Sequence, residues 1–187
     1  LQRWTTQLIP PELMGSHVGP AFSHTTGRHA TLRFRCLTAL FGHAGMELDL
    51  TELDDGELDV LTRWGALYKE YRGLIHSGTM VRTEPDPSLW VHGAVSGDRT
   101  EALFAVVCLD SSAEDRPDRV RLPGLAPRYR VTVVPGLSDP GHSIAPPPWL
   151  ASGVELPGSV LERVGVAIPG LHPQTGLLLS VRAATTG

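Results

Sequence analysis

Apolar residues recur along this chain at two different periods. Up to about Gly78 they return at steps of three to four residues, the period of an α-helix, and short apolar segments at 13–18 and 46–50 separate the helical stretches. After Gly78 apolar and polar residues alternate, which is the period of a half-buried strand. The pattern therefore predicts an α/β part over residues 1–78 and an all-β part over residues 79–187.

Three segments of the first part have the apolar spacing of helices: residues 1–9, 31–41 and 54–78. The last has the clearest signals, because Asp54 is placed to cap its N-terminus and Glu57 stands at the capping-box position. With the two short segments predicted as strands, helices and strands alternate. This order is typical of a parallel β/α arrangement, although two strands alone do not close a sheet.

The second part contains several short strand candidates separated by turn residues. They are residues 89–95, 102–109, 129–133, 164–168 and 177–182. The segment 102–109 is almost wholly apolar, as expected of a strand that is buried on both faces. This spacing is typical of an antiparallel β-sandwich. Residues 136–148 are rich in Pro, Gly and Ser, and we expect them to form a long exposed loop.

Composition and charge exclude several partners. The net charge is −4 with acids and bases interspersed, so no basic stripe favours nucleic acid. No apolar run reaches the roughly 20 residues that cross a bilayer, which predicts a soluble protein. We expect a cytoplasmic location, which two reduced cysteines would fit. Cys36 and Cys108 lie inside apolar segments and are predicted to be buried, reduced thiols. The chain begins with Leu1, which indicates either processing or a longer parent protein.

Two acidic residues are candidate catalytic carboxylates. Glu47 and Asp49 stand two apart in the predicted strand 46–50, and would then point to the same face. Two carboxyl groups about 5 to 5.5 Å apart perform retaining glycoside hydrolysis. Two acids on one strand would however flank one side of a substrate. We favour a structural role, in which they bind backbone amides or basic neighbours such as Arg28 or Arg35.

Residues 12–28 run from the first predicted strand into a stretch of small and polar residues. In a β/α barrel, the segment after a strand lies at the catalytic face. Ser16 and His17 are therefore candidate substrate-binding residues that would donate hydrogen bonds to sugar hydroxyls; the alternative is that Gly15 and His17 only shape the turn. The spacing of the eight histidines matches no zinc motif. We predict no metal site and no cofactor.

Several blocks, taken in order, resemble glycoside hydrolase family 36, the α-galactosidases. They are residues 14–18 (MGSHV), 26–28 (TGR), 41–50 (FGHAGMELDL), 68–69 (YK), 74–78 (LIHSG) and 164–169 (VGVAIP). The resemblance covers nearly the whole chain except the loop 136–148. It implies the end of a (β/α)8 TIM barrel, with residues 13–18 and 46–50 as barrel strands seven and eight, followed by a C-terminal antiparallel β-sandwich.

The resemblance also implies a retaining mechanism on an α-galactoside substrate. In this family one Asp attacks the anomeric carbon, and a second Asp protonates the leaving oxygen and then activates water. The nucleophile follows a Lys in a strand well upstream, and the acid/base belongs to a Ser-Asp motif just before the helix that residues 1–9 would complete. Neither motif stands at such a position here, so we assign no catalytic residue and expect this chain alone to be inactive.

Two other functions stay open for residues 79–187. They could form a carbohydrate-binding module, for which Trp90 and Trp149 are the candidate stacking platforms. They could instead brace the barrel and mediate a homo-oligomer of the full-length enzyme. Residues 1–78 would supply only two of eight barrel strands, and we therefore hypothesise that this part is mobile or aggregation-prone without the rest of the barrel.

Overall fold

The computed structural model describes residues 2–111, 119–125, 128–139 and 146–184. The first part contains the following elements in chain order: α1 (Gln2–Thr5), η1 (Pro11–Leu13), β1 (Gly15–Val18), β2 (Phe22–Ser23), β3 (Arg28–His29), α2 (Leu32–Ala39), β4 (His43–Met46), η2 (Leu50–Glu52) and α3 (Asp55–Ser77). The second contains β5 (Thr79–Asp86), β6 (Leu89–Val95), β7 (Glu101–Cys108), β8 (Arg128–Val133), α4 (Trp149–Ser152), β9 (Val154–Pro157), α5 (Gly158–Arg163) and β10 (Thr175–Ala183).

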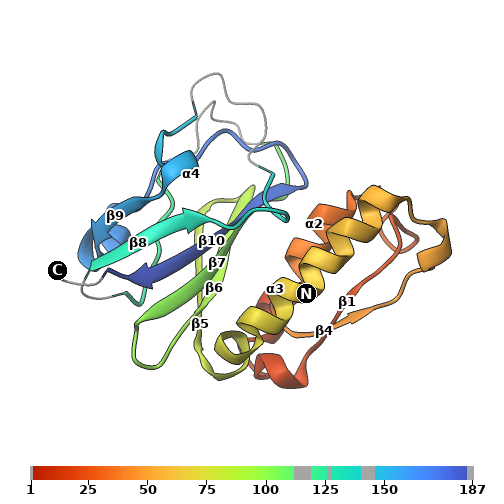
Figure 1. Cartoon of the computed structure of the whole chain (residues 1–187), viewed down its shortest axis with the longest axis horizontal. Coiled ribbons are helices and arrows are strands. Elements are labelled where there is room, and N and C mark those ends of the chain that lie inside the picture. Colours follow the sequence, from red (N-terminus) through yellow and green to blue (C-terminus); the bar gives the residue numbers. More distant parts are fainter. Residues whose placement is uncertain (1, 112–118, 126–127, 140–145, 185–187) are drawn as a thin grey trace.

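Helices α2 and α3 lie between two sheets of different kinds (Figure 1). On one side, β1 and β4 form a parallel pair in which Gly15 aligns with His43 and Val18 with Met46. On the other side, six strands form an antiparallel sheet in the order β5-β6-β7-β10-β8-β9. The expected change from a parallel β/α part to an antiparallel all-β part is therefore present in the molecule.

The two central strands of the large sheet are apolar on both faces because each face meets its own core. From β7, Leu103 and Ala105 join the core that contains α2 and α3. Their neighbours Phe104 and Val106 join a second core, under the segments around Leu122 and α5. This explains why residues 102–109 are almost wholly apolar, and it confirms the prediction of a strand buried on both faces.

The core around α2 and α3 continues across the junction between the two parts of the chain. It contains Val18 from β1, Ile75 from α3 and Leu178 from β10, all with no exposed surface. At the same junction Tyr71 donates a buried hydrogen bond to Ser180, at 3.2 Å between the two oxygens. Residues 1–78 are thus anchored to the antiparallel sheet, whatever covers their other face.

The ends of α3 form as the sequence predicts. The Asp54 side chain accepts a hydrogen bond from the Glu57 amide, and the Glu57 side chain accepts one from the Asp54 amide, so the capping box is complete. Gly78 follows the last turn and donates its amide to the Leu74 carbonyl. The following residue, Thr79, already belongs to β5, which the alternation of apolar residues did not reveal.

The predicted strand over residues 46–50 is wrong in its position. The strand is β4, which ends at Met46, and the chain then turns into η2. Asp49 causes the turn, because its carboxylate accepts hydrogen bonds from both the amide and the hydroxyl of Thr51. An acid that caps a helical turn in this way cannot continue a strand.

The predicted strand over residues 164–168 is also wrong. Helix α5 runs to Arg163, and Gly165 then adopts a φ of 80°, in the left-handed region. A Cβ at Gly165 would lie 2.2 Å from the Val120 carbonyl oxygen, so glycine is needed for the close approach as well. Only an isolated bridge between Val120 and Val166 remains of the expected strand. The sheet gains β9 in its place.

Residues 140–145 of the predicted loop 136–148 lie outside the described residues. Its beginning packs onto the protein rather than projecting from it. Leu137 is buried, and the Asp139 amide donates to the Gly176 carbonyl at the start of β10.

Both cysteines are free and buried, as predicted. Cys36 lies in α2 and Cys108 at the end of β7. Burial raises the pKa of the Cys36 thiol from its ordinary value of 9.0 to about 12. A raised pKa in the folded state means that the neutral thiol is favoured, so the associated stability is complete below pH 9 and is lost as the pH rises towards 12.

We predict that Gly176→Ala loosens the junction between α2 and the sheet. A Cβ at this position would lie 2.5 Å from the Val106 carbonyl oxygen and 2.7 Å from Cδ2 of Leu37. Such overpacking is expected to lower the free energy of unfolding by about 1–3 kcal/mol in urea denaturation. Gly65→Ala is the matched control, because it lies inside α3 with nothing within 4 Å. It should raise stability by roughly 0.5–1 kcal/mol; the reverse order would contradict this packing.

A second prediction concerns the pH dependence of stability. The free energy of unfolding should fall between pH 9 and about pH 12 because Cys36 ionises more readily in the unfolded chain. Denaturant titrations of the wild type and of Cys36→Ala across this range measure the effect, since the variant lacks that part of the slope. Identical slopes for the two proteins would show that the thiol is not in the buried environment described here.

Candidate functional site

Alternation along β1 sends neighbouring side chains to opposite faces of the parallel pair. Ser16 and Val18 are buried on the face that α2 covers. Gly15 and His17 lie on the other face, which no described element covers. In β4, Gly45 aligns with His17 and shares this open face. The His17 side chain projects from the open face between these two glycines.

The His17 ring occupies the space that the two glycines leave free. A Cβ at Gly45 would lie 2.5 Å from Cδ2 of His17, and one at Gly15 would lie 3.4 Å from Cε1. The Glu47 carboxylate, one residue beyond β4, stands 3.6 Å from Nδ1 of His17. The two side chains are 46% and 69% exposed, so their attraction contributes little to stability and mainly orients the imidazole.

The two predicted substrate-binding residues do not share a surface. Ser16 is 1% exposed, and its Cβ lies close to Gly42, where an added Cβ would approach it to 2.8 Å. His17 is exposed on the opposite face. Adjacent positions of a strand differ in this way by necessity, because successive side chains alternate.

The two acids that the sequence singled out have separate roles. Asp49 caps η2. The hydrogen bond that its carboxylate accepts from the Thr51 hydroxyl lowers the pKa of the carboxyl most, and the hydrogen bond from the Thr51 amide lowers it further. This confirms the structural role expected of Asp49. Glu47 faces His17 rather than a basic neighbour. Of the two arginines proposed as partners, Arg35 instead donates to the carbonyls of Gly19 and Ala30.

Neither candidate tryptophan forms a flat exposed platform. Trp149 packs against the second core and donates its indole N–H to the Ala167 carbonyl at 2.7 Å. Trp90 lies on β6 and is half-buried. Trp149 therefore contacts the far side of the sheet and not the junction between the two parts of the chain.

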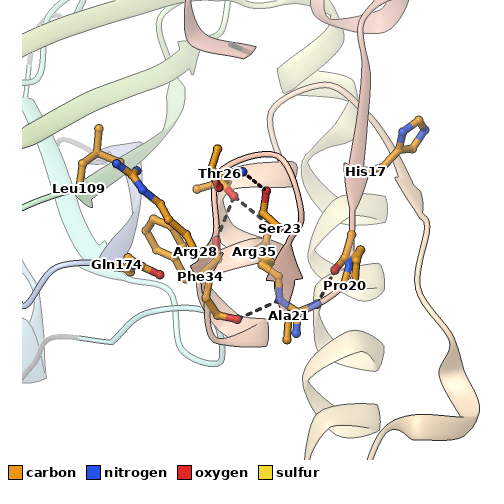
Figure 2. A pocket seen from close by; sticks show the side chains of 13 residues that line it. His17, Pro20, Ala21, Ser23, Thr26, Arg28, Phe34, Arg35, Leu109 and Gln174 are labelled. Carbon is orange, nitrogen blue, oxygen red and sulfur yellow. Dashed lines mark hydrogen bonds between the residues drawn. The ribbon is translucent and has the colours of Figure 1, made fainter.

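A small hairpin follows β1 at its carboxyl end. Strands β2 and β3 pair Phe22 with His29, whose rings lie 5.1 Å apart between centroids. Beneath this hairpin is a cavity of about 260 Å³, which also contacts α2 and the turn before β10 (Figure 2). Sequence reasoning did not identify it, because the turn residue Gln174 is distant in the chain and carries no motif.

Within the described ranges, no group of three or more His, Cys, Asp or Glu side chains is arranged to hold a metal ion. None of the helices in those ranges is long and apolar enough to span a bilayer.

Comparison with known proteins identifies the family. A protein-family model described as melibiase matches residues 1–78. An α-galactosidase of Escherichia coli is 38% identical over 193 aligned positions, which cover 98% of this chain and 27% of that protein. α-Galactosidase AgaA of Geobacillus stearothermophilus is 35% identical over 129 positions, covering 67% of this chain and 17% of that protein. The chain belongs to the family 36 α-galactosidases.

Solved structures of family 36 enzymes share the fold described above. A variant of AgaA from Geobacillus stearothermophilus in complex with raffinose superposes with a TM-score of 0.81 and 28% identity, covering 98% of this chain and 24% of that one. The galactosidase domain of the α-galactosidase-sucrose kinase AgaSK gives a TM-score of 0.79 and 27% identity, covering 96% and 23%. The chain thus spans only about a quarter of these family 36 proteins.

We predict that Gly45→Ala displaces the His17 ring from the open face. The added methyl group would lie only 2.5 Å from Cδ2 of His17, so the ring must rotate away from its present position. Histidine-ring NMR of the chain should then show a changed His17 signal. Gly73→Ala, in α3 with nothing within 4 Å, is the control and should leave that signal unaltered. An unchanged His17 signal in Gly45→Ala would contradict the position of the ring beside Gly45.

Proposed function

We propose that this chain is the C-terminal part of an α-galactosidase that releases terminal α-linked galactose from galacto-oligosaccharides with retention. Strands β1 and β4 would be strands seven and eight of a (β/α)8 barrel, and residues 79–187 the C-terminal β-sandwich. The single observation that carries this is the open face of the parallel pair. Its outward side chains, His17 and Glu47, stand at the carboxyl ends of the strands, where barrel enzymes place their active sites.

Exposed apolar residues in the first part of the chain support a missing complement. Nine large apolar side chains of the described residues are exposed, and eight of them belong to residues 1–58: Trp4, Leu8, Ile9, Leu13, Phe22, Met46, Leu50 and Leu58. Leu8 and Leu13 are 89% and 73% exposed. Such a concentration marks a surface that another body covers. In the proposal, the preceding strands and helices of the barrel cover it.

The arrangement of carboxylates supports inactivity of the chain by itself. Retaining hydrolysis needs a nucleophile and an acid/base on opposite sides of the scissile bond, about 5–5.5 Å apart. On the described part of the open face, Glu47 has His17 as its partner and no second carboxylate. Asp49 is engaged with Thr51. Both catalytic aspartates are expected in the preceding part of the barrel.

His17 is proposed to contact substrate hydroxyls. Its ring faces the open side and has Glu47 at Nδ1, which leaves Nε2 as a donor or acceptor for the substrate. Ser16 was predicted to act with it, but its buried side chain faces the helices. The proposal of direct substrate contact therefore rests on His17 alone.

The proposal extends to the environment of the full-length enzyme. We expect a homo-oligomer in which the antiparallel domain contributes contacts, and a cytoplasmic location, which two free buried thiols favour. The alternative, an independent sugar-binding module, receives less support, because Trp149 is committed to the second core through its indole N–H.

Hydrolysis of p-nitrophenyl α-galactoside tests the proposed function. The 187-residue chain should release no nitrophenol above background, whereas a version extended upstream to the length of its relatives should be active. In the extended protein, His17→Ala should lower kcat/KM by roughly threefold to tenfold, the cost of about one hydrogen bond. His24→Ala, in the exposed hairpin turn, is the matched control. Hydrolysis by the short chain would refute the missing-carboxylate account.

A further inference from the structure

The cavity beneath the β2–β3 hairpin has walls from both parts of the chain. Ser23, Thr26 and Arg28 come from the hairpin and Phe34 from α2. Leu109, just after β7, and Gln174, just before β10, close the opposite side. In Figure 2 the His17 ring points away from this group of side chains. His17 is also among the residues that line the cavity, but its ring is turned away, so the cavity borders the open face of β1 and β4 and its interior is a separate candidate site.

Two polar side chains on opposite walls of the cavity have no partner within the described chain. The guanidinium of Arg28 makes no hydrogen bond or ion pair with a described residue, and neither does the side-chain amide of Gln174. Arg35, which also lines the cavity, differs because its guanidinium binds the Gly19 and Ala30 carbonyls. Arg28 and Gln174 are thus available to a ligand, while Arg35 holds the wall in place.

The backbone at Gln174 is held in an unusual conformation. Its φ of 61° lies in the left-handed region, which glutamine rarely adopts. The Gln174 amide donates to the Cys108 carbonyl at 2.8 Å, and the next residue is fixed by the hydrogen bond from the Thr175 hydroxyl to the His172 carbonyl. Strain of this kind, held by surrounding bonds, is found at sites where a side chain must be presented in one direction.

The size and lining of the cavity define the class of ligand. Its volume of about 260 Å³ is slightly below the roughly 300 Å³ at which pockets for drug-sized ligands begin, so it suits one sugar ring rather than a chain of them. Phe34 offers an aromatic surface to apolar C–H groups. Arg28 offers paired donors, Gln174 offers both a donor and an acceptor, and the hairpin hydroxyls add further groups.

We propose that this cavity binds a single neutral pyranose unit, as a second carbohydrate site outside the proposed barrel active site. The C–H face of the ring packs on Phe34. The guanidinium of Arg28 donates to two adjacent hydroxyl oxygens, and the Gln174 amide bonds a hydroxyl on the opposite side of the ring. A carbohydrate held here spans the hairpin, α2 and the antiparallel sheet, and so links the two parts of the chain.

The test is an NMR titration of the whole 187-residue chain with methyl α-D-galactopyranoside. The side-chain signals of Gln174 and Arg28 should shift with saturation. Arg28→Ala and Gln174→Gly should each weaken binding by at least about tenfold, as expected when a hydrogen bond from a charged or strictly oriented group is lost. Glycine at 174 keeps the left-handed backbone without strain, so the turn stays folded. Arg33→Ala, an exposed arginine on α2 outside the cavity, should bind normally.

Two further measurements separate this site from its alternatives. Glu47→Ala, on the open face and outside the cavity lining, should leave the binding unchanged; loss of binding in this variant would place the sugar on the open face and overturn the second site. A parallel titration with inorganic phosphate should give no saturable shift. Phosphate binding that needs Arg28 but not Gln174 would show an anion site instead, and no sugar-induced shift would also refute the proposal. None of these results depends on hydrolysis, so the proposed function is tested separately.

Discussion

Helices α2 and α3 are buried from two directions, and this constraint organises the molecule. Together they pack against the small parallel pair on one side and the antiparallel sheet on the other. This double packing requires apolar residues along their inner faces. Ile75, with no exposed surface, lies in this shared core with Leu37 and Leu178. The close approach of Leu37 to the sheet in turn requires glycine at position 176. The parallel part is therefore well fixed on its helix side, whereas the face that carries His17 is open.

Local signals in the sequence were sufficient for the elements whose neighbours are close in the chain. The capping box at Asp54 predicted the start of α3, and the apolar segment around Phe104 predicted a strand with a core on each face. Prediction failed where a turn depended on one side chain or one backbone conformation. Asp49 ends the segment after β4 by binding Thr51, and the left-handed Gly165 prevents a strand. Periodicity of apolar residues contains neither kind of information.

The candidate site was predictable only in part, for a related reason. The polar stretch 12–28 pointed to Ser16 and His17, and His17, within β1, does face the open side. The stretch could not distinguish His17 from Ser16, because that choice depends on which face the helices cover. The position of the His17 ring between Gly15 and Gly45 also depends on the register of the two strands, which the sequence does not show. The cavity with Arg28 and Gln174 joins residues about a hundred and fifty positions apart, and no local pattern connects them.

The central claim is that β1 and β4 are two strands of a barrel, whose outer edges pair with further strands and whose open face lines the barrel interior. Amide hydrogen exchange, compared between this chain and the same sequence inside the longer enzyme, tests it most directly. The account predicts slow exchange in β6, β7 and β10 in both proteins, with the outer edges of β1 and β4 slow only in the longer one. Equally strong protection of β1, β4 and the large sheet in the short chain would contradict it.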